Sequence, residues 1–169
     1  MKSQADSSDE EKAPIGQPAS AFALDAFLPY RLALLSSLVS RSIQKLYETE
    51  FDISIPEWRL IAILGSDGPM TANDIRGRAA MDKVQVSRAA AKLSKSGHIM
   101  RQTDPDDRRK STLSLTHTGQ TIYNHIVPMA LDREAFLTSA LTEKEKGDLI
   151  KLLEKLTNRA EKMTNNSIR

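Results

Sequence analysis

Apolar residues recur at helical spacing along most of the chain and predict a mainly α-helical fold. The predicted helices cover residues 27–50, 56–64, 71–79, 82–96, 116–139 and 142–163. Pro29 fits the first turn of its helix, whereas Pro128 lies inside the fifth helix and predicts a kink there. Two runs with strand-like alternation, residues 98–103 and 111–115, flank a short charged turn. The expected fold class is therefore mainly α with a small β-hairpin.

Residues 71–96 have the caps and the spacing of two consecutive short helices. Thr71 is a favourable N-cap, and Asp74, three residues on, complements the positive end of the first helix. Asp82 and Gln85 form a capping-box pattern at the second helix, and Gly97 suits its C-terminal cap. Only about three residues separate the two helices, which is the turn length of a helix-turn-helix.

The second of these helices has one apolar face and one polar face. Val86, Ala90 and Leu93 recur at helical spacing and predict packing against the first helix. Gln and Arg can make paired hydrogen bonds to adenine and guanine edges in the major groove, while Ser and Lys suit phosphates. The candidate DNA-binding residues of this unit are Thr71, Lys83, Gln85, Ser87, Arg88 and Lys92. The alternative is an ordinary amphipathic helix with a solvated charged face.

The turn between the predicted strands is basic and resembles the wing of a winged helix. Arg108, Arg109 and Lys110 place three cations at its tip, where arginines can enter the narrow minor groove. Residues 76–110 contain ten Lys and Arg against four acids, a difference of +6, while the whole chain is only +2. Positive charge is thus concentrated where DNA binding requires it. The alternative is a solvated surface turn.

The run DPDDRRKSTLSLTHTG resembles the wing signature of the MarR family of bacterial transcription regulators. In that signature an Asp-x-Arg pair is followed by a strand and Leu-Thr-x-x-Gly, here Asp107, Arg109, Leu115, Thr116 and Gly119. The segment QVSRAAAKLSKSGHI is similar to the family's recognition helix, with its Ser-Arg pair at Ser87 and Arg88.

The resemblance covers about residues 27–163. It implies a winged helix-turn-helix in an obligate dimer that binds a palindromic operator. It also implies that Asp107 orients Arg109 by an ion pair, although Asp106 and Arg108 form an alternative pair.

The last predicted helix carries an apolar stripe that is expected to pack against another helix. The stripe consists of Leu149, Leu152, Leu153, Leu156, Ala160 and Met163. In the family the first and last helices of two subunits interleave, and the alternative is packing within one subunit. A two-fold dimer presents two recognition helices to successive major grooves, about 34–36 Å apart. A ligand that binds more tightly to the dimer at one distance between its recognition helices than at another would then control DNA binding.

Family members bind small aromatic effectors between the dimerisation helices and the winged domain. The candidate lining residues are Tyr30, Arg31, Ser40, Arg41, Trp58 and Tyr123. The two arginines could hold a carboxylate or phosphate, or they could pair across the dimer, and Trp58 could be a core residue. The segments FLPYRLALLSSLVSR and SIPEWR resemble the subset that controls breakdown of hydroxycinnamate-type aromatic acids. That resemblance implies an aromatic acid or its coenzyme A thioester as effector.

Composition and charge divide the chain into three regions. Residues 1–26 are expected to form a flexible acidic tail, residues 56–116 the winged helix-turn-helix, and residues 27–55 and 117–169 the dimerisation region. The chain has no cysteine, so disulfide and thiolate chemistry are excluded. With no long apolar run and no signal peptide pattern, we expect a cytoplasmic protein without membrane contact.

Enzyme motifs are missing from the sequence. It contains no HExxH, GxSxG, P-loop or GxGxxG pattern, and its three histidines lack metal-ligand spacing. We therefore predict no catalytic residues, no metal and no cofactor other than the effector. The predicted function is a ligand-responsive transcription regulator, with repression as the family's commoner mode. The alternatives are a winged-helix module for protein contacts and, less favoured, a small helical enzyme.

Overall fold

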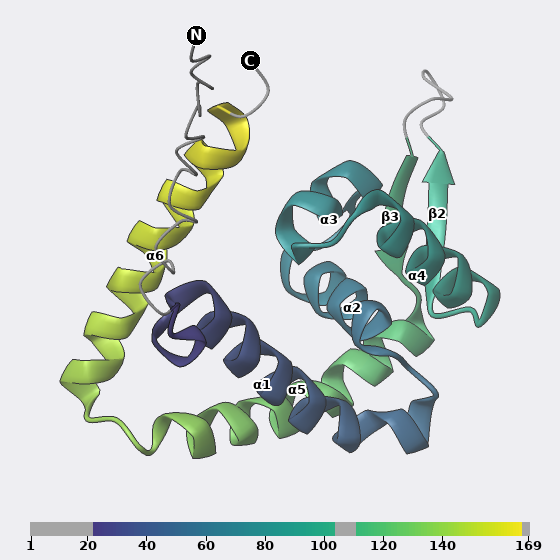
Figure 1. The fold of residues 1–169 in the computed structure, drawn as a ribbon. Coiled ribbons are helices and arrows are strands. Elements are labelled where there is room, and N and C mark those ends of the chain that lie inside the picture. The colour runs from purple at the N-terminus through teal and green to yellow at the C-terminus, as the bar shows by residue number, and fades with distance from the viewer. Residues whose placement is uncertain (1–21, 104–110, 167–169) are drawn as a thin grey trace, which may run out of the picture. The chain divides into compact units, whose positions relative to one another are not determined.

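The computed structural model describes residues 22–103 and 111–166, with side chains described as far as residue 163. Within that part of the chain it contains six α-helices, a 3₁₀ turn and one three-stranded sheet (Figure 1). The elements are η1 (Leu24–Ala26), α1 (Leu28–Phe51), α2 (Ile55–Asp67), β1 (Met70–Thr71), α3 (Ala72–Ala79), α4 (Lys83–Lys95), β2 (Ile99–Thr103), β3 (Ser111–Leu115), α5 (His117–Thr138) and α6 (Glu143–Asn166). The predicted fold class is confirmed.

The chain forms two compact units, residues 1–36 and 37–169. The described part of the first unit contains η1 and the first turns of α1, and the rings of Phe22 and Phe27 meet edge to face at 5.1 Å. The second unit contains the remaining elements. The 3₁₀ turn lies at the end of the segment 1–26 that we expected to be a tail, and residues 1–21 lie outside the described part.

Reciprocal side-chain caps fix where the helices of the winged domain begin. The Asp74 amide donates to Thr71 Oγ1 at 3.3 Å, and the Thr71 amide donates back to Asp74 Oδ2 at 3.3 Å. At α4 the Gln85 amide donates to Asp82 Oδ1 at 2.7 Å. Both caps follow the sequence prediction, because short polar side chains at these positions satisfy amides that have no partner within the helix.

The core of the second unit lies where α2 packs against α3, α4 and α5. The predicted inner face of α4 is confirmed, since Val86, Ala90 and Leu93 are buried. From α2, Leu60 and Ile61 are fully buried. Burial of this kind contributes about 1.5–3 kcal/mol for each large aliphatic side chain, so it holds the two helices of the helix-turn-helix in a fixed orientation.

The sheet is antiparallel with strand order β1-β3-β2, so the hairpin is joined by a third strand that we did not predict. Met70 pairs with Leu113, and Ile99 pairs with Leu115. Strand β1 is only two residues long, too short to show alternation, and the tertiary contact with β3 creates it. The predicted strands 98–103 and 111–115 are otherwise confirmed to within one residue.

Helix α2 is longer than predicted, because Gly65 does not end it. The helix continues to Asp67 and ends at Gly68, whose φ of 82° suits glycine. A Cβ atom on Gly65 would lie 2.3 Å from the Tyr123 ring of α5. Gly65 is therefore a packing site for an aromatic ring and not a helix stop.

The Thr116-x-x-Gly119 pattern has a clear structural reason. Thr116 caps α5 by accepting a hydrogen bond from the Gly119 amide at 3.1 Å. A Cβ atom on Gly119 would lie only 2.0 Å from the carbonyl oxygen of His98. Because glycine has no Cβ atom, the first turn of α5 can pack directly against the backbone of His98, which lies between α4 and β2.

Helices α5 and α6 leave many apolar side chains exposed in the single chain. Ile122 and Ile126 of α5 are buried, whereas Leu137 is 43% exposed. On α6 the predicted stripe is exposed along its length, with Leu149 42% and Leu156 43% exposed. Pro128 lies inside α5 as predicted. Among the described helices, none combines the length and the apolar character that a membrane span needs.

Candidate nucleic-acid interface and effector cavity

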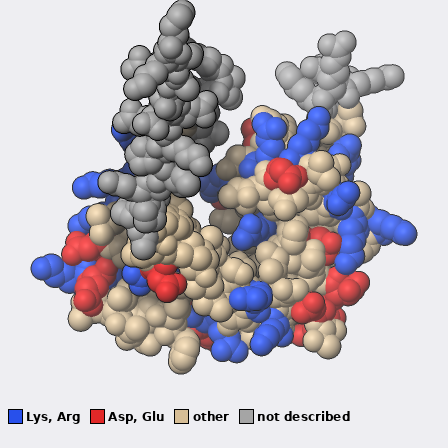
Figure 2. Space-filling view, in the orientation of Figure 1, with Lys and Arg blue, Asp and Glu red and all other residues tan. Residues whose placement is uncertain are grey.

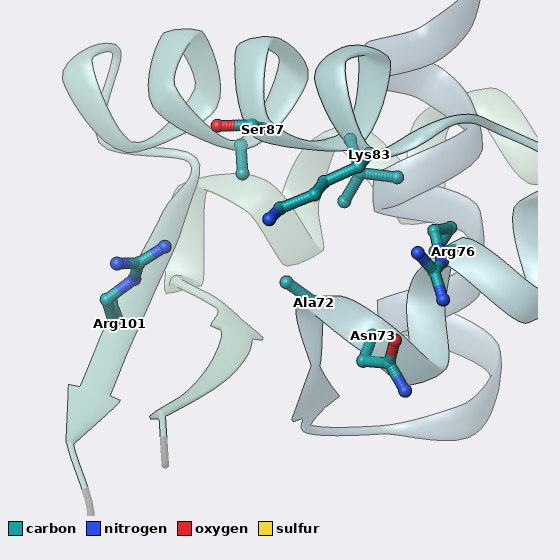
Figure 3. Close-up of a pocket in the computed structure, with 8 residues that line it drawn as sticks. Ala72, Asn73, Arg76, Lys83, Ser87 and Arg101 are labelled. Carbon is teal, nitrogen blue, oxygen red and sulfur yellow. The ribbon is translucent and has the colours of Figure 1, made fainter. Parts of the chain in front are cut away.

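A groove of about 370 Å³ lies between α3, α4 and β2 (Figure 3). Its lining consists of Ala72, Asn73 and Arg76 from α3, Lys83, Val86, Ser87 and Ala90 from α4, and Arg101 from β2. In Figure 3 the Lys83 and Arg101 side chains extend into the space between helix and strand, and Arg76 and Asn73 lie across from them. Three elements therefore converge on one basic concavity.

The electrostatic character of this groove is set by three cations and no lining carboxylate among the described residues. For Arg76, Lys83 and Arg101 the structure records no ion pair with another described residue, so their charges face solvent. Arg78 of α3 differs, because it pairs with Asp67 at the end of α2. Figure 2 shows that basic side chains gather on the upper part of the winged domain, while acidic side chains lie mostly lower on it. Such a surface attracts a polyanion.

The solvent face of α4 continues this surface. Arg88 and Lys95 are exposed, and they lie on the side of the helix opposite the buried Val86 and Leu93. A helix that buries one face and presents arginine on the other can enter a major groove, where guanidinium groups bind guanine edges. The predicted residues Lys83, Ser87 and Arg88 thus lie on or beside the basic groove.

Two other predicted DNA-binding residues of α4 make contacts within the protein. The Asp82 amide donates to Gln85 Oε1 at 3.2 Å, so that oxygen is part of the helix cap. Lys92 Nζ donates to the Asp52 carbonyl oxygen at 2.9 Å and lies 3.3 Å from Glu57 Oε2. Both side chains lie on the flank of α4 that faces the α1–α2 loop, away from the basic groove.

Lys92 and Glu57 form a half-buried junction between three elements. Glu57 is 6% exposed and caps α2 by accepting a hydrogen bond from the Ser54 amide at 3.0 Å. Its hydrogen bond to Lys92 raises the pKa of the lysine above its usual value. Asp52, at the end of α1, has a φ of 50° and presents its carbonyl to the same ammonium group. We call Lys92, Glu57 and Asp52 the lysine junction.

The remaining predicted DNA-binding residues have mixed outcomes. The Thr71 hydroxyl is part of the α3 cap and donates to Asp74 Oδ2 at 2.7 Å. Asp107, Arg108, Arg109 and Lys110 lie outside the described residues. Sequence reasoning counted Arg76 and Arg101 in the charge excess but did not assign them to the site, and it missed Asn73. Their convergence depends on how α3 and β2 pack, and no spacing along the chain indicates it.

A second, smaller cavity of about 200 Å³ lies between α1 and α2. It is lined by Ser40, Ile43 and Tyr47 from α1 and by Ile55, Trp58 and Arg59 from α2. Arg59 Nη2 donates to Ser40 Oγ at 3.4 Å, so a cation and a hydroxyl meet at the cavity wall. This combination of apolar walls with a few polar groups is typical of a small-molecule site.

Tyr47 gives this cavity an unsatisfied polar group. The side chain is fully buried, and its hydroxyl hydrogen-bonds to no described protein atom. Burial, with a smaller contribution from Glu48, raises the pKa of Tyr47 from 10.0 to about 12. A buried hydroxyl without a partner costs stability, and this one belongs to a residue that lines the same cavity as Arg59.

The predicted effector residues are only partly brought together. Ser40 and Trp58 line the cavity, and Tyr123 stacks on the outer face of Trp58 with ring centroids 6.5 Å apart. Arg41 is exposed on α1.

Tyr30 and Arg31 belong to the first unit, where both are exposed. Sequence reasoning missed Tyr47 and Arg59. The one signal available was the Trp-Arg pair in SIPEWR, from which only Trp58 was chosen.

The described residues contain no group of three or more His, Asp or Glu side chains that could hold a metal ion. The side chains that line the two sites supply hydrogen-bonding, charged and apolar groups.

Known proteins resemble this chain most clearly in the region of the winged domain. A model of the MarR family matches residues 53–111. An uncharacterised HTH-type transcriptional regulator of Bacillus subtilis is 30% identical over 99 residues, which are 59% of this chain and 64% of the relative. The homoprotocatechuate degradative operon repressor of Escherichia coli is 26% identical over 98 residues, 58% of this chain and 66% of the repressor. The matches thus span just under two thirds of these relatives' lengths.

Solved structures resemble a larger part of the chain. A MarR/EmrR family transcriptional regulator from Acinetobacter sp. ADP1 is 28% identical with a TM-score of 0.77, covering 83% of this chain and 99% of that protein. NadR, solved in complex with 4-hydroxyphenylacetate, is 21% identical with a TM-score of 0.70, covering 83% of this chain and 97% of NadR. The second likeness establishes the fold alone. These relatives are transcription regulators and not enzymes.

Proposed function

We propose that this chain is a MarR-family repressor that leaves a palindromic operator when an aromatic acid binds, because a model of that family of transcription regulators matches residues 53–111. The observation that carries the proposal is the basic groove, where Arg76, Lys83 and Arg101 face solvent beside the exposed Arg88 of α4. Neither the protein-contact alternative nor an enzyme requires three cations, none of them paired with another described residue, to converge from three elements.

DNA recognition in this proposal divides between two kinds of contact. Arg88 binds a base edge in the major groove, and the cations of the basic groove bind phosphates on either side. Arg109, oriented by Asp107 and flanked by Arg108 and Lys110, enters the adjacent minor groove. A homodimer repeats these contacts in a second half-site, which is why the operator is palindromic.

The effector site in this proposal is the cavity between α1 and α2. A carboxylate would accept hydrogen bonds from Tyr47, Ser40 and the Arg59 guanidinium, and an aromatic ring would lie against Trp58. The cavity volume of about 200 Å³ lies below the roughly 300–1,000 Å³ of sites for drug-sized ligands, and a coenzyme A thioester is larger still. Volume therefore favours a free aromatic acid.

Two relatives support this choice of ligand class. The Escherichia coli repressor is named for an operon that degrades homoprotocatechuate, and NadR was solved with 4-hydroxyphenylacetate. Both compounds are small aromatic acids. Arg41 remains a proposed contact of the effector, with Arg59 as the first candidate for the carboxylate.

DNA binding is tested by selecting operators from random duplexes and measuring affinity by fluorescence anisotropy at several salt concentrations. Affinity should fall steeply as salt rises, because each phosphate contact releases a counterion. Arg88→Ala should lose about 1–3 kcal/mol on the operator and relax specificity at one base position. Arg133→Ala, an exposed arginine of α5, is the matched control and should bind as the wild type does. If no operator is selected and binding does not depend on salt, the protein-contact alternative replaces this proposal.

Effector binding is tested by a thermal-shift screen of aromatic acids and their coenzyme A thioesters, followed by release of the labelled operator. A free acid should raise the melting temperature, because it binds only the folded state, and it should release DNA. Arg59→Met should abolish both effects and leave operator affinity intact. A response to thioesters alone, or a full response in Arg59→Met, would place the effector elsewhere.

A further inference from the structure

Val84 is an apolar side chain on the solvent side of α4. It is 55% exposed, whereas Val86, two residues later, is 2% exposed. The residues that anchor α4 in the core are Val86, Ala89, Ala90 and Leu93. At 100° per residue, Val84 and Arg88 fall on the opposite side of the helix from these four. The side chain that faces solvent most directly at the start of the helix is thus a branched hydrocarbon.

The neighbours of Val84 are groups that suit a DNA duplex. Lys83 precedes it and lines the basic groove. Arg88 and Ala91 follow on the same face and are both exposed. Gln85 lies on another flank, and its amide oxygen is part of the α4 cap. The outward face of α4 therefore runs from an isopropyl group to a guanidinium to a methyl group, bordered by cations.

We propose that Val84 is a specificity-determining residue that contacts the 5-methyl group of a thymine in the major groove. This inference rests on the proposed function and goes further by naming a base and an atom. Residues at the N-terminus of a recognition helix contact base edges, and thymine is the base that presents a methyl group in that groove. An exposed valine gains by burying its methyl groups there, while the cations beside it bind phosphates.

The position of the thymine follows from the helix. Side chains four residues apart on one face have Cβ atoms about 5–6 Å apart, so Val84 and Arg88 reach bases within one or two steps of each other. The thymine therefore lies one or two base-pair steps from the base that Arg88 binds. Burying one methyl group contributes about 0.8 kcal/mol, which is about a fourfold change in affinity for each half-site.

The test is a cycle that removes a methyl group from the protein and from the DNA. The full-length protein first selects its operator from random duplexes, and each thymine is then replaced in turn by deoxyuridine, which lacks the 5-methyl group. At one thymine position in each half-site, replacement should lower the affinity of the wild-type protein for the operator about fourfold. Val84→Ala should lose about fourfold for each half-site, hence about sixteenfold on the native operator, because both subunits of the dimer carry the change, and it should be insensitive to deoxyuridine at that position alone.

Val84→Thr is the matched control, because it keeps one of the two γ-methyl groups on a β-branched side chain and should stay sensitive to that replacement. The salt dependence of binding should be the same in all three proteins, since no phosphate contact changes. Equal sensitivity of wild type and Val84→Ala to every replacement would overturn the inference while leaving the proposed function intact. If the wild type selects no operator, the proposed function fails and the inference fails with it.

Discussion

At the scale of single residues, Tyr47 shows a conflict between stability and binding. Its ring is fully buried against Trp58, with ring centroids 5.7 Å apart, and contributes apolar contact. Its hydroxyl, however, hydrogen-bonds to no described atom and was removed from water on folding. A residue chosen for packing alone would be phenylalanine, so the hydroxyl fits a group retained for a ligand.

Tyr47→Phe should therefore separate the two roles. Stability at neutral pH should be unchanged or raised by up to about 1 kcal/mol in urea unfolding, because no protein hydrogen bond is lost. The same variant should bind the aromatic acid several-fold more weakly in the thermal-shift assay. A large loss of stability would mean that the hydroxyl has a partner in the folded protein, and unchanged acid binding would remove it from the effector site.

The pH dependence of stability gives a second test of Tyr47. Burial raises its pKa from 10.0 to about 12, so the folded protein keeps this proton where the unfolded chain loses it. The stabilisation that comes from keeping this proton is fully present below about pH 10. It is lost as pH rises towards 12, so the free energy of unfolding falls over that range. Lys92, whose pKa is also raised, loses its contribution in the alkaline range too. Chemical unfolding at pH 8 to 12 should show a shallower decline in Tyr47→Phe, and an unchanged decline would contradict the assignment.

The residue scale is also where sequence reasoning was least complete. It placed Lys92 with Arg88 on one polar face, because helical periodicity separates buried from exposed positions but does not divide the exposed arc. The two side chains diverge because Glu57 and Asp52, about forty residues earlier, meet Lys92 in space. Arg59 and Tyr47 were missed for the same reason, since they are brought together only where α1 and α2 face each other.

At the scale of elements, local signals were sufficient for most boundaries. The caps at Thr71 and Asp82 were predicted because each depends on residues three positions apart. Strand β1 and the end of α2 were not predicted, because both depend on distant partners, β3 and Tyr123.

The close approach of α2 and α5 can be tested at Gly65. Gly65→Ala places a Cβ atom where the Tyr123 ring now lies, so the ring must move and the stack on Trp58 must change. We expect a loss of about 1–3 kcal/mol in urea unfolding, typical of overpacking. Tyr123→Ala removes the obstacle, and the double variant should be more stable than the sum of the two single losses predicts. Additive losses would show that Gly65 and Tyr123 do not contact each other in solution.

The lysine junction makes a different prediction, because it joins α1, α2 and α4 through one ammonium group. Lys92→Met should lose about 1–2 kcal/mol, since the buried Glu57 carboxylate is then left without its cation. Glu57→Gln combined with Lys92→Met should show coupling in a double-mutant cycle measured by urea unfolding. Lys95→Met is the matched control, being an exposed lysine on the same helix, and should have little effect. If Lys92→Met lowers operator affinity without lowering stability, Lys92 contacts DNA as the sequence first indicated.

At the scale of the whole molecule, exposed apolar surface is the feature that a single chain does not explain. Leu149, Leu152 and Leu156 of α6 are 42%, 56% and 43% exposed, and Phe136 near the end of α5 is 78% exposed. Contiguous apolar surface of this kind marks an interface. The proposed homodimer covers it and at the same time sets the distance between two recognition helices.

The dimer can be tested by placing charges on this stripe. Leu149→Glu with Leu156→Glu should shift the protein to monomers in sedimentation velocity, because two carboxylates would be buried without partners. Among the described residues the hydrophobic core includes none from α6, so circular dichroism should show the protein still folded, and weak salt-dependent binding to random DNA should remain. Operator affinity should fall far more, since simultaneous contact with two half-sites is lost. Lys151→Glu, on the polar side of α6, is the control and should stay dimeric. A double variant that remains dimeric with full operator affinity would mean that α6 covers its leucines in another way, and that the spacing of the recognition helices is set elsewhere.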